Sequence, residues 1–463
     1  MYDYELLVIG AGPGGQTAAL RAARLGMKTA VIEAREPGGT CVNRGCVSTK
    51  TLLHSSSLYR AAAEGAAIGV HADGLRADLD EIFANKRRIA QTLSQGVESL
   101  FKSAKIPLIH GRAKILAPHR VQVEQPDGSS VERTAEHILV ATGAAPMRLP
   151  LPGMDLPGVL TSEELLEGPD RLYRSLVIIG GGVIGIEFAC FFSDLGCEVT
   201  VLEGLDRLLP MLDRELGQNL ALILKKKNVR VCTSALVEQV EACEGGLRVQ
   251  FSVKGKPDAV TGEAVLCAVG RRAAWEGLFA EGLEPERNGR ILKVNERFAT
   301  SIPSVYAIGD VASETQLAHV AAAQGQICAE LLCGQKDPMN MGIVPSCVYC
   351  RPEIAVVGLT EGEAKAAGIP VKTGKCVMGG NARTLIEDPG RSFMKVLAHA
   401  ETGKILGAQL MCPNAADMIS QISQAIANGM TPEQLLIAMR PHPSFEESLS
   451  DALRDLAEKL KKA

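Results

Sequence analysis

Two cysteines, Cys41 and Cys46, are the residues whose type and spacing point most directly to chemistry. They lie in the segment GGTCVNRGCVSTK, residues 38–50, which continues into a run of residues compatible with a helix. A spacing of five residues is about one and a half helical turns, so we expect both thiols on the opening turns of one helix. Unpaired N–H groups and the helix dipole favour a thiolate there, and a thiolate is what disulfide exchange requires. Two buried cysteines acting as small hydrophobic residues remain the alternative on spacing alone, because the pair matches neither CxxC nor a metal pattern.

The position of the pair favours the redox interpretation, because a dinucleotide-binding fingerprint precedes it. Residues 5–9 are predicted to form a strand, residues 10–15 (GAGPGG) a turn, and the following alanine-rich segment a helix to about residue 25. A second strand then ends at Glu33, eight residues before Cys41. In this context the glycines let the backbone approach a pyrophosphate at the helix N-terminus, and Glu33 can accept a hydrogen bond from a ribose hydroxyl.

A second fingerprint appears after residue 175. A predicted strand at 175–179 leads into GGGVIG at 180–185, a helix through Leu195, and a strand that ends at Glu203. Two dinucleotide sites in one chain indicate an electron relay between two cofactors, although neither fingerprint identifies its own. Glu203 can bind a free ribose 2′-hydroxyl and would repel a 2′-phosphate, and Arg207 is the one nearby cation, so NADH is favoured over NADPH.

Length and composition set the frame in which these sites lie. The chain has 463 residues and 46% hydrophobic content, which predicts about three domains. Its net charge of −4 is well mixed, so we expect no nucleic-acid partner, and the lack of a basic leader or a long apolar run predicts a soluble, cytoplasmic protein without membrane spans. Thirteen cysteines fit a reducing compartment, where a disulfide that forms is catalytic. We expect Cys347 and Cys350 to be structural cysteines in a strand, and we expect no metal site.

The segments between the motifs predict how the elements are connected. Helical periodicity at residues 80–105 predicts a long scaffold helix, residues 113–124 are strand-like, and residues 137–140 lead into Ala141-Thr142-Gly143. The Pro- and Gly-rich residues 145–159 predict a crossover between domains. A later strand ends in Tyr306-Ala307-Ile308-Gly309-Asp310, before another alanine-rich helix.

Taken together, the ordered motifs GAGPGG, GGTCVNRGC, ATG, GGGVIGIE, YAIGD and HPSFEE extend from residue 10 to residue 447. In these motifs the chain resembles the pyridine nucleotide-disulfide oxidoreductases, and among them most closely the members that oxidise dihydrolipoamide. The resemblance implies an α/β fold with two Rossmann-like dinucleotide-binding domains, the NAD domain inserted in the FAD domain, and an α+β C-terminal dimerisation domain. The expected boundaries are 1–146 and 271–341 for the two parts of the FAD domain, 147–270 for the NAD domain and 342–463 for the dimerisation domain.

The resemblance also implies roles for individual side chains. Cys46 matches the thiol that faces the flavin, Cys41 the thiol that exchanges with substrate, and Lys50 a lysine near the flavin that pairs with Glu187. A cation beside a flavin stabilises negative charge on the reduced ring, and a carboxylate partner limits the cost of burying that cation. The residues expected to hold FAD are Gly10, Gly12, Gly14, Gly15, Glu33, Gly39, Thr40, Lys50, Ala141, Thr142, Gly143, Gly309 and Asp310, and those expected to hold NAD are Gly180, Gly182, Gly185, Glu203 and Gly270.

His442 resembles the acid–base histidine of the family, with Glu447 as its orienting carboxylate. A histidine suits proton transfer near neutral pH, and a carboxylate fixes its tautomer. An exposed turn histidine is the alternative for His442, and Glu447 also completes a capping box that begins at Ser444, so this carboxylate could fill both roles. In this family the histidine reaches the disulfide of the other subunit, which implies a homodimer.

The resemblance leaves several functions open. Ser48, Arg440 and Ser444 depart from common family residues without removing a catalytic group. A glutathione reductase is disfavoured because such enzymes generally use NADPH, which Glu203 would repel. A mercuric reductase is disfavoured because such enzymes usually carry a cysteine pair near the C-terminus, and no cysteine follows Cys412 here. The expected partner is a lipoyl-bearing carrier of a 2-oxoacid dehydrogenase or glycine-cleavage system, and a chiefly structural docking subunit of such a complex is the alternative from another functional class.

Overall fold

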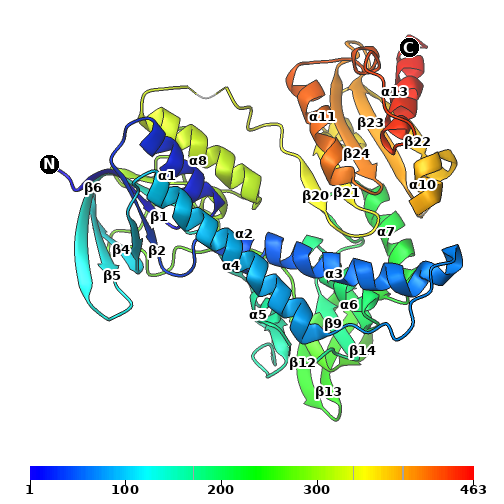
Figure 1. The fold of residues 1–463 in the computed structure, drawn as a ribbon, viewed down its shortest axis with the longest axis horizontal. Coiled ribbons are helices and arrows are strands. Elements are labelled where there is room, and N and C mark those ends of the chain that lie inside the picture. Colours follow the sequence, from blue (N-terminus) through cyan, green and yellow to red (C-terminus); the bar gives the residue numbers. More distant parts are fainter. Residues whose placement is uncertain (170, 337, 388–389, 463) are drawn as a thin grey trace.

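The computed structural model describes residues 1–169, 171–336, 338–387 and 390–462. Within these residues the three largest sheets, of seven, five and five strands, lie in separate parts of the molecule (Figure 1). The long helices α3 (Cys46–Glu64) and α4 (Leu79–Ser103) extend from the first of these parts across the second. Asp78 caps α4 by accepting a hydrogen bond from the Glu81 N–H at 3.2 Å, as expected for a scaffold helix near residues 80–105.

The first sheet has the strand order β3-β2-β1-β6-β5-β4, and β19 pairs with the free side of β6 in its C-terminal half. Strand β1 pairs in parallel with β2 and β6, and its residues from Leu6 to Ile9 are buried on both faces. Burial on both faces explains why this strand is a continuous apolar run and does not alternate. The strands are β1 (Tyr4–Ile9), β2 (Thr29–Glu33), β3 (Leu108–His110), β4 (Arg112–Ala117), β5 (Arg120–Glu124), β6 (Ser130–Val140) and β19 (Val305–Ala307).

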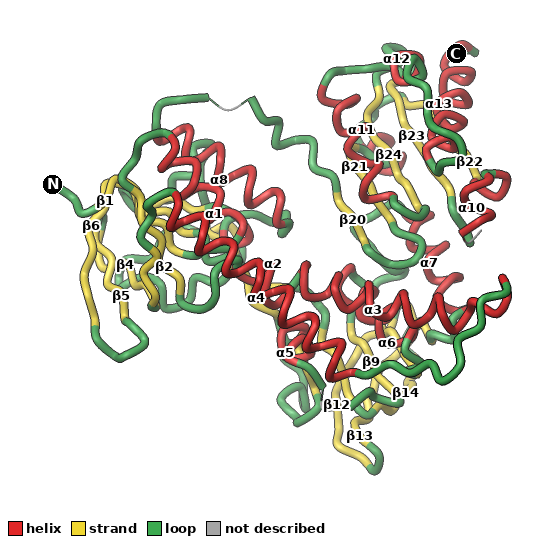
Figure 2. The backbone as a smooth tube through the Cα atoms, viewed as in Figure 1, coloured by secondary structure: helices red, strands yellow, loops and turns green. Residues whose placement is uncertain are grey.

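Two helices that are far apart in sequence, α1 (Pro13–Arg24) and α8 (Ala318–Leu332), pack side by side over this sheet (Figure 2). Their approach is close enough that a Cβ on Gly325 would lie 2.3 Å from the carbonyl oxygen of Gly14. The absence of a side chain at Gly325 therefore allows the C-terminal part of the first domain to close onto its N-terminal part.

The second sheet, β11-β10-β9-β15-β8, is entirely parallel. Its strands are β8 (Val159–Thr161), β9 (Ser175–Ile179), β10 (Glu198–Glu203), β11 (Arg230–Thr233) and β15 (Ala264–Cys267), and its helices are α5 (Ser162–Glu167), α6 (Val183–Asp194) and α7 (Arg214–Lys226). An antiparallel sheet of β12 (Ala235–Cys243), β13 (Gly246–Val253) and β14 (Lys256–Gly262) packs beside it.

The chain leaves the first region and returns to it through two short strands. β7 (Ala144–Pro146) pairs antiparallel with β16 (Arg271–Ala273), and a small ribbon of β17 (Arg287–Asn288) and β18 (Ile291–Leu292) follows. The whole second sheet thus lies between two parts of the first region, which confirms the predicted insertion of one dinucleotide-binding domain in another.

The third sheet, β20-β21-β24-β23-β22, is entirely antiparallel. Successive side chains of a strand face opposite sides of the sheet, and those of β23 pack against other elements on both sides. Met394, Val396 and Ala398 pack under α11 and α13, whereas Phe393 joins the core of the second domain. The elements are β20 (Ser346–Val348), β21 (Ile354–Gly358), α9 (Glu361–Ala366), β22 (Val371–Val377), α10 (Ala382–Glu387), β23 (Phe393–His399), β24 (Ile405–Met411), α11 (Ala415–Ala427), α12 (Pro432–Leu435) and α13 (Glu446–Lys461). This sheet with its helices confirms the predicted α+β C-terminal domain.

No helix within the described residues is long and apolar enough to cross a membrane.

Candidate active site

The two cysteines lie on two consecutive helices, which corrects the expectation of a single one. Cys41 lies in the short helix α2 (Gly39–Arg44), and Cys46 is the first residue of α3. Gly45 separates the helices because its backbone, at φ −152° and ψ −120°, is not helical. A Cβ at this position would also lie 2.9 Å from the Thr40 carbonyl oxygen, so a side chain does not fit between the helices.

The Cys46 thiol is activated by its neighbours. A hydrogen bond from Cys41 to the Cys46 sulfur, together with the charge of Lys50, lowers the pKa of Cys46 from its ordinary 9.0 to about 6, although burial acts in the opposite direction. The same hydrogen bond raises the pKa of Cys41. Cys46 also stands at the N-terminus of α3, where unpaired N–H groups stabilise an anion. The pair therefore consists of one thiolate and one protonated thiol near neutral pH.

Ser48 helps to fix the relation between the two helices. Its buried hydroxyl donates to the carbonyl oxygens of Val42, at 3.1 Å, and Asn43, at 2.9 Å. These carbonyls belong to α2, so the first turn of α3 is held against the helix that carries Cys41. The serine that departs from the common family residue thus has a structural role in this chain.

Lys50 lies at the meeting point of three domains. Its Nζ is 2.8 Å from Oε2 of Glu187 on α6, whose side chain is only 3% exposed. The other carboxylate oxygen, Oε1, accepts a hydrogen bond from the Tyr349 N–H at 3.1 Å. The Lys50 Nζ also lies 4.7 Å from the centroid of the Tyr349 ring, within range of a cation–π contact. Sequence reasoning missed Tyr349, because nothing local links it to a lysine about 300 positions earlier.

The carboxyl ends of parallel strands bring the first fingerprint and two later motifs to one edge of the first sheet. Ile9 and Ala307 both lie in register with Val140, so Gly10, Ala141-Thr142-Gly143 and Gly309-Asp310 follow neighbouring strands. The Glu33 carboxylate accepts hydrogen bonds from the N–H groups of Ala11, at 2.7 Å, and Arg35, at 2.9 Å. This acid therefore also holds the glycine turn against the end of β2.

The same edge has features that fit a dinucleotide such as FAD. The buried hydroxyl of Thr142 has no hydrogen-bond partner within the described structure, although it lies in the cleft wall. Gly10, at φ +108°, adopts a backbone conformation that favours glycine, and a Cβ there would lie 2.4 Å from the Ala141 carbonyl oxygen. Helix α8 begins at Ala318 without a side-chain cap, and its first turn lines the cleft, so its free N–H groups face a place where negative charge can be held.

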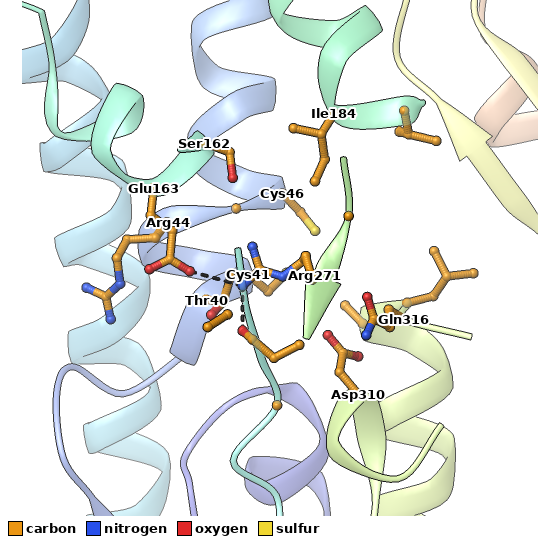
Figure 3. A pocket seen from close by; sticks show the side chains of 18 of the residues that line it. Thr40, Cys41, Arg44, Cys46, Ser162, Glu163, Ile184, Arg271, Asp310 and Gln316 are labelled. Atoms are coloured by element: carbon orange, nitrogen blue, oxygen red, sulfur yellow. Dashed lines mark hydrogen bonds and ion pairs between the residues drawn. The ribbon is translucent and has the colours of Figure 1, made fainter. Parts of the chain in front are cut away.

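Arg271 and Glu163 are further polar residues of this region that sequence reasoning missed. The Arg271 guanidinium, whose side chain is 12% exposed, donates to Glu163 Oε1 at 3.0 Å and to the Ala144 carbonyl oxygen. It also faces Asp310, whose pKa is raised by burial while the Arg271 charge acts against that shift. Cys46, Arg271, Asp310 and Gln316 project toward one space (Figure 3). The one sequence feature that could have pointed to Arg271 is its position next to Gly270, which was predicted to hold the nucleotide.

The second fingerprint repeats the geometry of the first. Glu203 accepts hydrogen bonds from the N–H groups of Gly181, at 2.6 Å, and Leu205, at 2.7 Å. The nearby Arg207 contacts Asp206 and the carbonyl oxygen of Pro210. The one cation noted in the sequence is thus engaged within its own loop.

One cleft of about 1980 Å³ joins these groups. The predicted residues that line it are Gly10, Gly12, Gly14, Glu33, Gly39, Thr40, Cys41, Cys46, Lys50, Ala141, Thr142, Gly143, Gly180, Gly182, Glu187, Glu203, Gly270, Gly309 and Asp310. Gly15 and Gly185 do not line it. A Cβ on Gly15 would lie 1.9 Å from the Gly10 carbonyl oxygen, and one on Gly185 would lie 2.0 Å from that of Gly180, so both glycines serve helix–strand packing.

His442 and Glu447 form a dyad elsewhere on the same chain. Nδ1 of His442 is 2.9 Å from Oε1 of Glu447, and the histidine side chain is 72% exposed. Neither residue belongs to the described lining of the cleft. One chain therefore does not bring the histidine to its own cysteines.

The capping box predicted at Ser444 is only half formed, which corrects the expectation from the sequence. Helix α13 begins at Glu446, and the Ser444 hydroxyl is buried without a hydrogen-bond partner in the described structure. Oε2 of Glu447 does accept from the Ser444 N–H at 3.0 Å, while Oε1 contacts His442. Both hydrogen bonds lower the pKa of Glu447, and the bond from Ser444 has the larger effect. A fixed carboxylate therefore lies behind the imidazole.

Cys347 and Cys350 differ in their surroundings. Cys347 lies in β20 and also lines the cleft, whereas Cys350 follows that strand and is buried. Burial raises the pKa of Cys347 to about 11 and that of Cys350 well above its ordinary value, so both remain protonated thiols. No cluster of metal-ligating side chains occurs among the residues that the structure describes.

Comparison with known proteins decides the family. The profile described as "Pyridine nucleotide-disulphide oxidoreductase" matches residues 4–325, and that of the dimerisation domain of the same family matches residues 344–453. The chain belongs to the pyridine nucleotide-disulphide oxidoreductase family. Members of this family use FAD and NAD(P)H, so the cleft is that of a flavoprotein disulfide oxidoreductase, and the dimerisation domain supports a homodimer.

Relatives within the family match over nearly their full length. A dihydrolipoyl dehydrogenase of Bacillus subtilis is 36% identical, with 97% of each chain covered, and dihydrolipoyl dehydrogenase 3 of Pseudomonas aeruginosa is 37% identical, with 98% of each covered. Among solved structures, LpdA of Mycobacterium tuberculosis has a TM-score of 0.89 and 30% identity, covering 97% of this chain and 99% of that one. The Cu(II) complex of the HOCl-induced flavoprotein disulfide reductase RclA of Escherichia coli has a TM-score of 0.86 and 29% identity, covering 98% and 99%.

Proposed function

We propose that this protein is a dihydrolipoyl dehydrogenase, which oxidises dihydrolipoamide to lipoamide and reduces NAD⁺ to NADH with release of one proton. The observation that carries the proposal is the single cleft that contains both dinucleotide fingerprints and the Cys41–Cys46 pair, with its depressed Cys46 pKa. Full-length relatives that are dihydrolipoyl dehydrogenases support the choice of substrate.

In the oxidised protein Cys41 and Cys46 form a disulfide. A thiolate of dihydrolipoamide attacks the Cys41 sulfur, the Cys41–Cys46 bond breaks, and Cys46 leaves as a thiolate. The second substrate thiol then displaces Cys41, which closes the lipoamide ring and leaves both cysteines reduced. Cys46 is the better leaving group because its pKa is depressed to about 6, whereas that of Cys41 is raised.

FAD, when bound, supplies the two-electron path from the reduced cysteine pair to the nicotinamide. Gly10, Thr142 and Asp310 would hold it, together with the open N-terminus of α8. Lys50 and Cys46 would lie beside its reactive ring, and Glu187 with Tyr349 would keep the Lys50 ammonium in place.

His442 would remove the proton from the attacking substrate thiol, and Glu447 would stabilise the imidazolium that results. We place this dyad at the cysteine pair of the second subunit, because neither residue lines the described cleft of its own chain. Exposed apolar side chains near the dyad, such as Ile437 and Met439, at 82% and 99% exposure, support burial of this surface in a homodimer.

NAD⁺ is proposed as the electron acceptor rather than NADP⁺. The buried Glu203 carboxylate would repel a 2′-phosphate, and Arg207 is engaged with Asp206 and Pro210. The proposed partner is a lipoyl-bearing carrier protein or domain of a 2-oxoacid dehydrogenase or glycine-cleavage system, and the protein acts in reducing surroundings such as the cytoplasm.

Anaerobic titration of the FAD-loaded protein tests the proposal. One equivalent of dihydrolipoamide should reduce the centre made of the cysteine pair and the flavin by two electrons, and addition of NAD⁺, but not of equal NADP⁺, should reoxidise it with formation of NADH. In the reverse direction, the NADH-reduced protein is offered lipoamide, oxidised glutathione, Hg(II) or Cu(II), with Cys41→Ser as the matched control. Faster turnover with glutathione or with a metal ion than with lipoamide would overturn the substrate assignment. Reduction by dihydrolipoamide in Cys41→Ser would overturn the mechanism.

A further inference from the structure

A buried lysine of the C-terminal domain forms an ion pair with the dinucleotide-binding domain. Lys395 lies on β23, and its side chain is only 4% exposed. Its Nζ is 2.7 Å from Oδ2 of Asp213, with carboxylate oxygens of Glu215 and Glu361 at 3.5 and 3.6 Å. Burial acts to lower the pKa of Lys395, but the hydrogen bond and charge of Asp213, together with the charges of Glu361 and Glu215, outweigh it and raise the pKa.

The strand pattern explains why Lys395 meets the second domain. Phe393 and Lys395 are two residues apart on β23 and therefore face the same side of the sheet. Phe393 packs in one hydrophobic cluster with Leu216 and Leu220 of α7. The lysine thus lies where this apolar cluster adjoins the carboxylates of Asp213, Glu215 and Glu361, and its buried charge needs such partners there.

Asp213 is the last residue of the loop that follows Glu203. It caps α7 by accepting a hydrogen bond from the Glu215 N–H at 2.9 Å. One carboxylate therefore sets the start of α7 and receives the Lys395 ammonium. Because Lys395 of the C-terminal domain fixes the position of Asp213, it also fixes the end of the loop at residues 204–213.

The middle of this loop is bonded to the second fingerprint. The Leu209 N–H donates to the Gly181 carbonyl oxygen at 2.9 Å, and the Gly181 N–H donates to Glu203 at 2.6 Å. Leu208 packs on Gly181 so closely that a Cβ there would lie 2.6 Å from the leucine side chain. A displacement of the loop would therefore move both the glycine turn and the acid that are assigned to the nucleotide.

We infer that Lys395 is a positioning residue for the nicotinamide nucleotide, acting through Asp213 on the loop at 204–213. Leu205, Pro210 and Met211 of this loop line the cleft itself. The C-terminal domain thus contributes to NAD⁺ affinity without touching NAD⁺. The inference rests on the proposed assignment of the second fingerprint to NAD⁺.

The experiment measures the dissociation constant of NAD⁺ for the FAD-loaded dimer by isothermal titration calorimetry. Lys395→Met should raise this constant by about tenfold, while dihydrolipoamide reduces the flavin at the wild-type rate. Lys375→Met is the matched control, since Lys375 lies on the neighbouring strand β22 and contacts Glu215 and the Phe393 ring but, within the described structure, forms no ion pair with Asp213. That variant should stay within about twofold of wild type.

Asp213→Asn provides a second test if Lys395→Met does not fold. Asparagine can still accept from the Glu215 N–H, so the cap of α7 remains while the ion pair is lost. A lowered thermal midpoint with an unchanged dissociation constant would make the pair purely structural and overturn the inference. Glu203→Ala separates the two levels of the argument: if it also leaves the constant unchanged, the assignment of the second fingerprint to NAD⁺ fails, whereas weakened binding in Glu203→Ala alone rejects only the role of Lys395.

Discussion

Removal of the Lys50 charge should affect stability and thiolate chemistry in separable ways. Lys50→Met leaves the Glu187 carboxylate, 3% exposed, with only the Tyr349 N–H as a hydrogen-bond partner among the described contacts. An uncompensated buried charge of this kind costs about 3–5 kcal/mol. Glu187→Gln should cost less, because the Lys50 side chain is 29% exposed and keeps its contact with the Tyr349 ring.

The double variant Lys50→Met/Glu187→Gln should recover most of the stability lost in Lys50→Met. It carries no buried charge at this position, and the glutamine oxygen can still accept from the Tyr349 N–H. Lys293→Met is a matched control, because it breaks an ion pair with the same 2.8 Å N–O distance between largely exposed side chains. That control should leave the denaturation midpoint unchanged.

The Cys46 pKa should follow a different order. Lys50 lowers and Glu187 raises the pKa of Cys46, which is about 6 in the wild type. Lys50→Met should therefore raise it by about one unit or more, Glu187→Gln should lower it, and the double variant should stay above wild type. The stability that the Cys46 thiolate adds to the reduced protein is fully present above pH 9, declines as the pH falls toward 6 and is lost below, because the folded-state pKa is depressed from 9.0.

The assay uses the FAD-loaded protein after anaerobic reduction of its cysteine pair. Denaturant titration gives the stability order, and the pH dependence of long-wavelength thiolate–flavin absorbance gives the Cys46 pKa. Shifts of that pKa in the same direction in Lys50→Met and Glu187→Gln would refute the electrostatic reasoning. A double variant that is no more stable than Lys50→Met would refute the account of the buried carboxylate.

Three further predictions concern the site residues. Cys41→Ser should leave a lone Cys46 thiolate and show long-wavelength absorbance without reduction, whereas Cys46→Ser should not; equal spectra would reverse the assignment. Glu203→Ala should lower the ratio of the KM for NADPH to the KM for NADH, because the substitution removes both a hydrogen bond to the ribose and a charge that repels the 2′-phosphate. A wild type that prefers NADPH would contradict this prediction. His442→Gln should slow dihydrolipoamide oxidation by about 10²- to 10⁴-fold while flavin reduction by NADH survives. Heterodimers of His442→Gln and Cys41→Ser subunits, confirmed by differential tags, should regain one working site. A heterodimer that is no more active than the two homodimeric variants would count against a site shared between subunits.

Features whose causes are local could be predicted from the sequence alone. Each fingerprint requires a strand, a glycine turn and a helix within about twenty residues, so the glycines, Glu33 and Glu203 could be assigned without a structure. The family resemblance that the ordered motifs carry then implied the insertion of one dinucleotide-binding domain in the other. The single helix expected for Cys41 and Cys46 was wrong because the backbone of Gly45, which can leave helical geometry, is fixed by packing against Thr40.

Contacts that join distant segments arise only when the domains pack together. Lys50 meets Glu187 across 137 residues, Arg271 meets Glu163 across 108, and Lys395 meets Asp213 across 182. No local pattern marks such pairs, because each charge is tolerated in the interior only once packing has brought its partner within hydrogen-bond distance. The position of His442 follows the same rule: its contact with Glu447 is local in sequence, but its distance from the cysteines of its own chain is set by how the C-terminal domain packs.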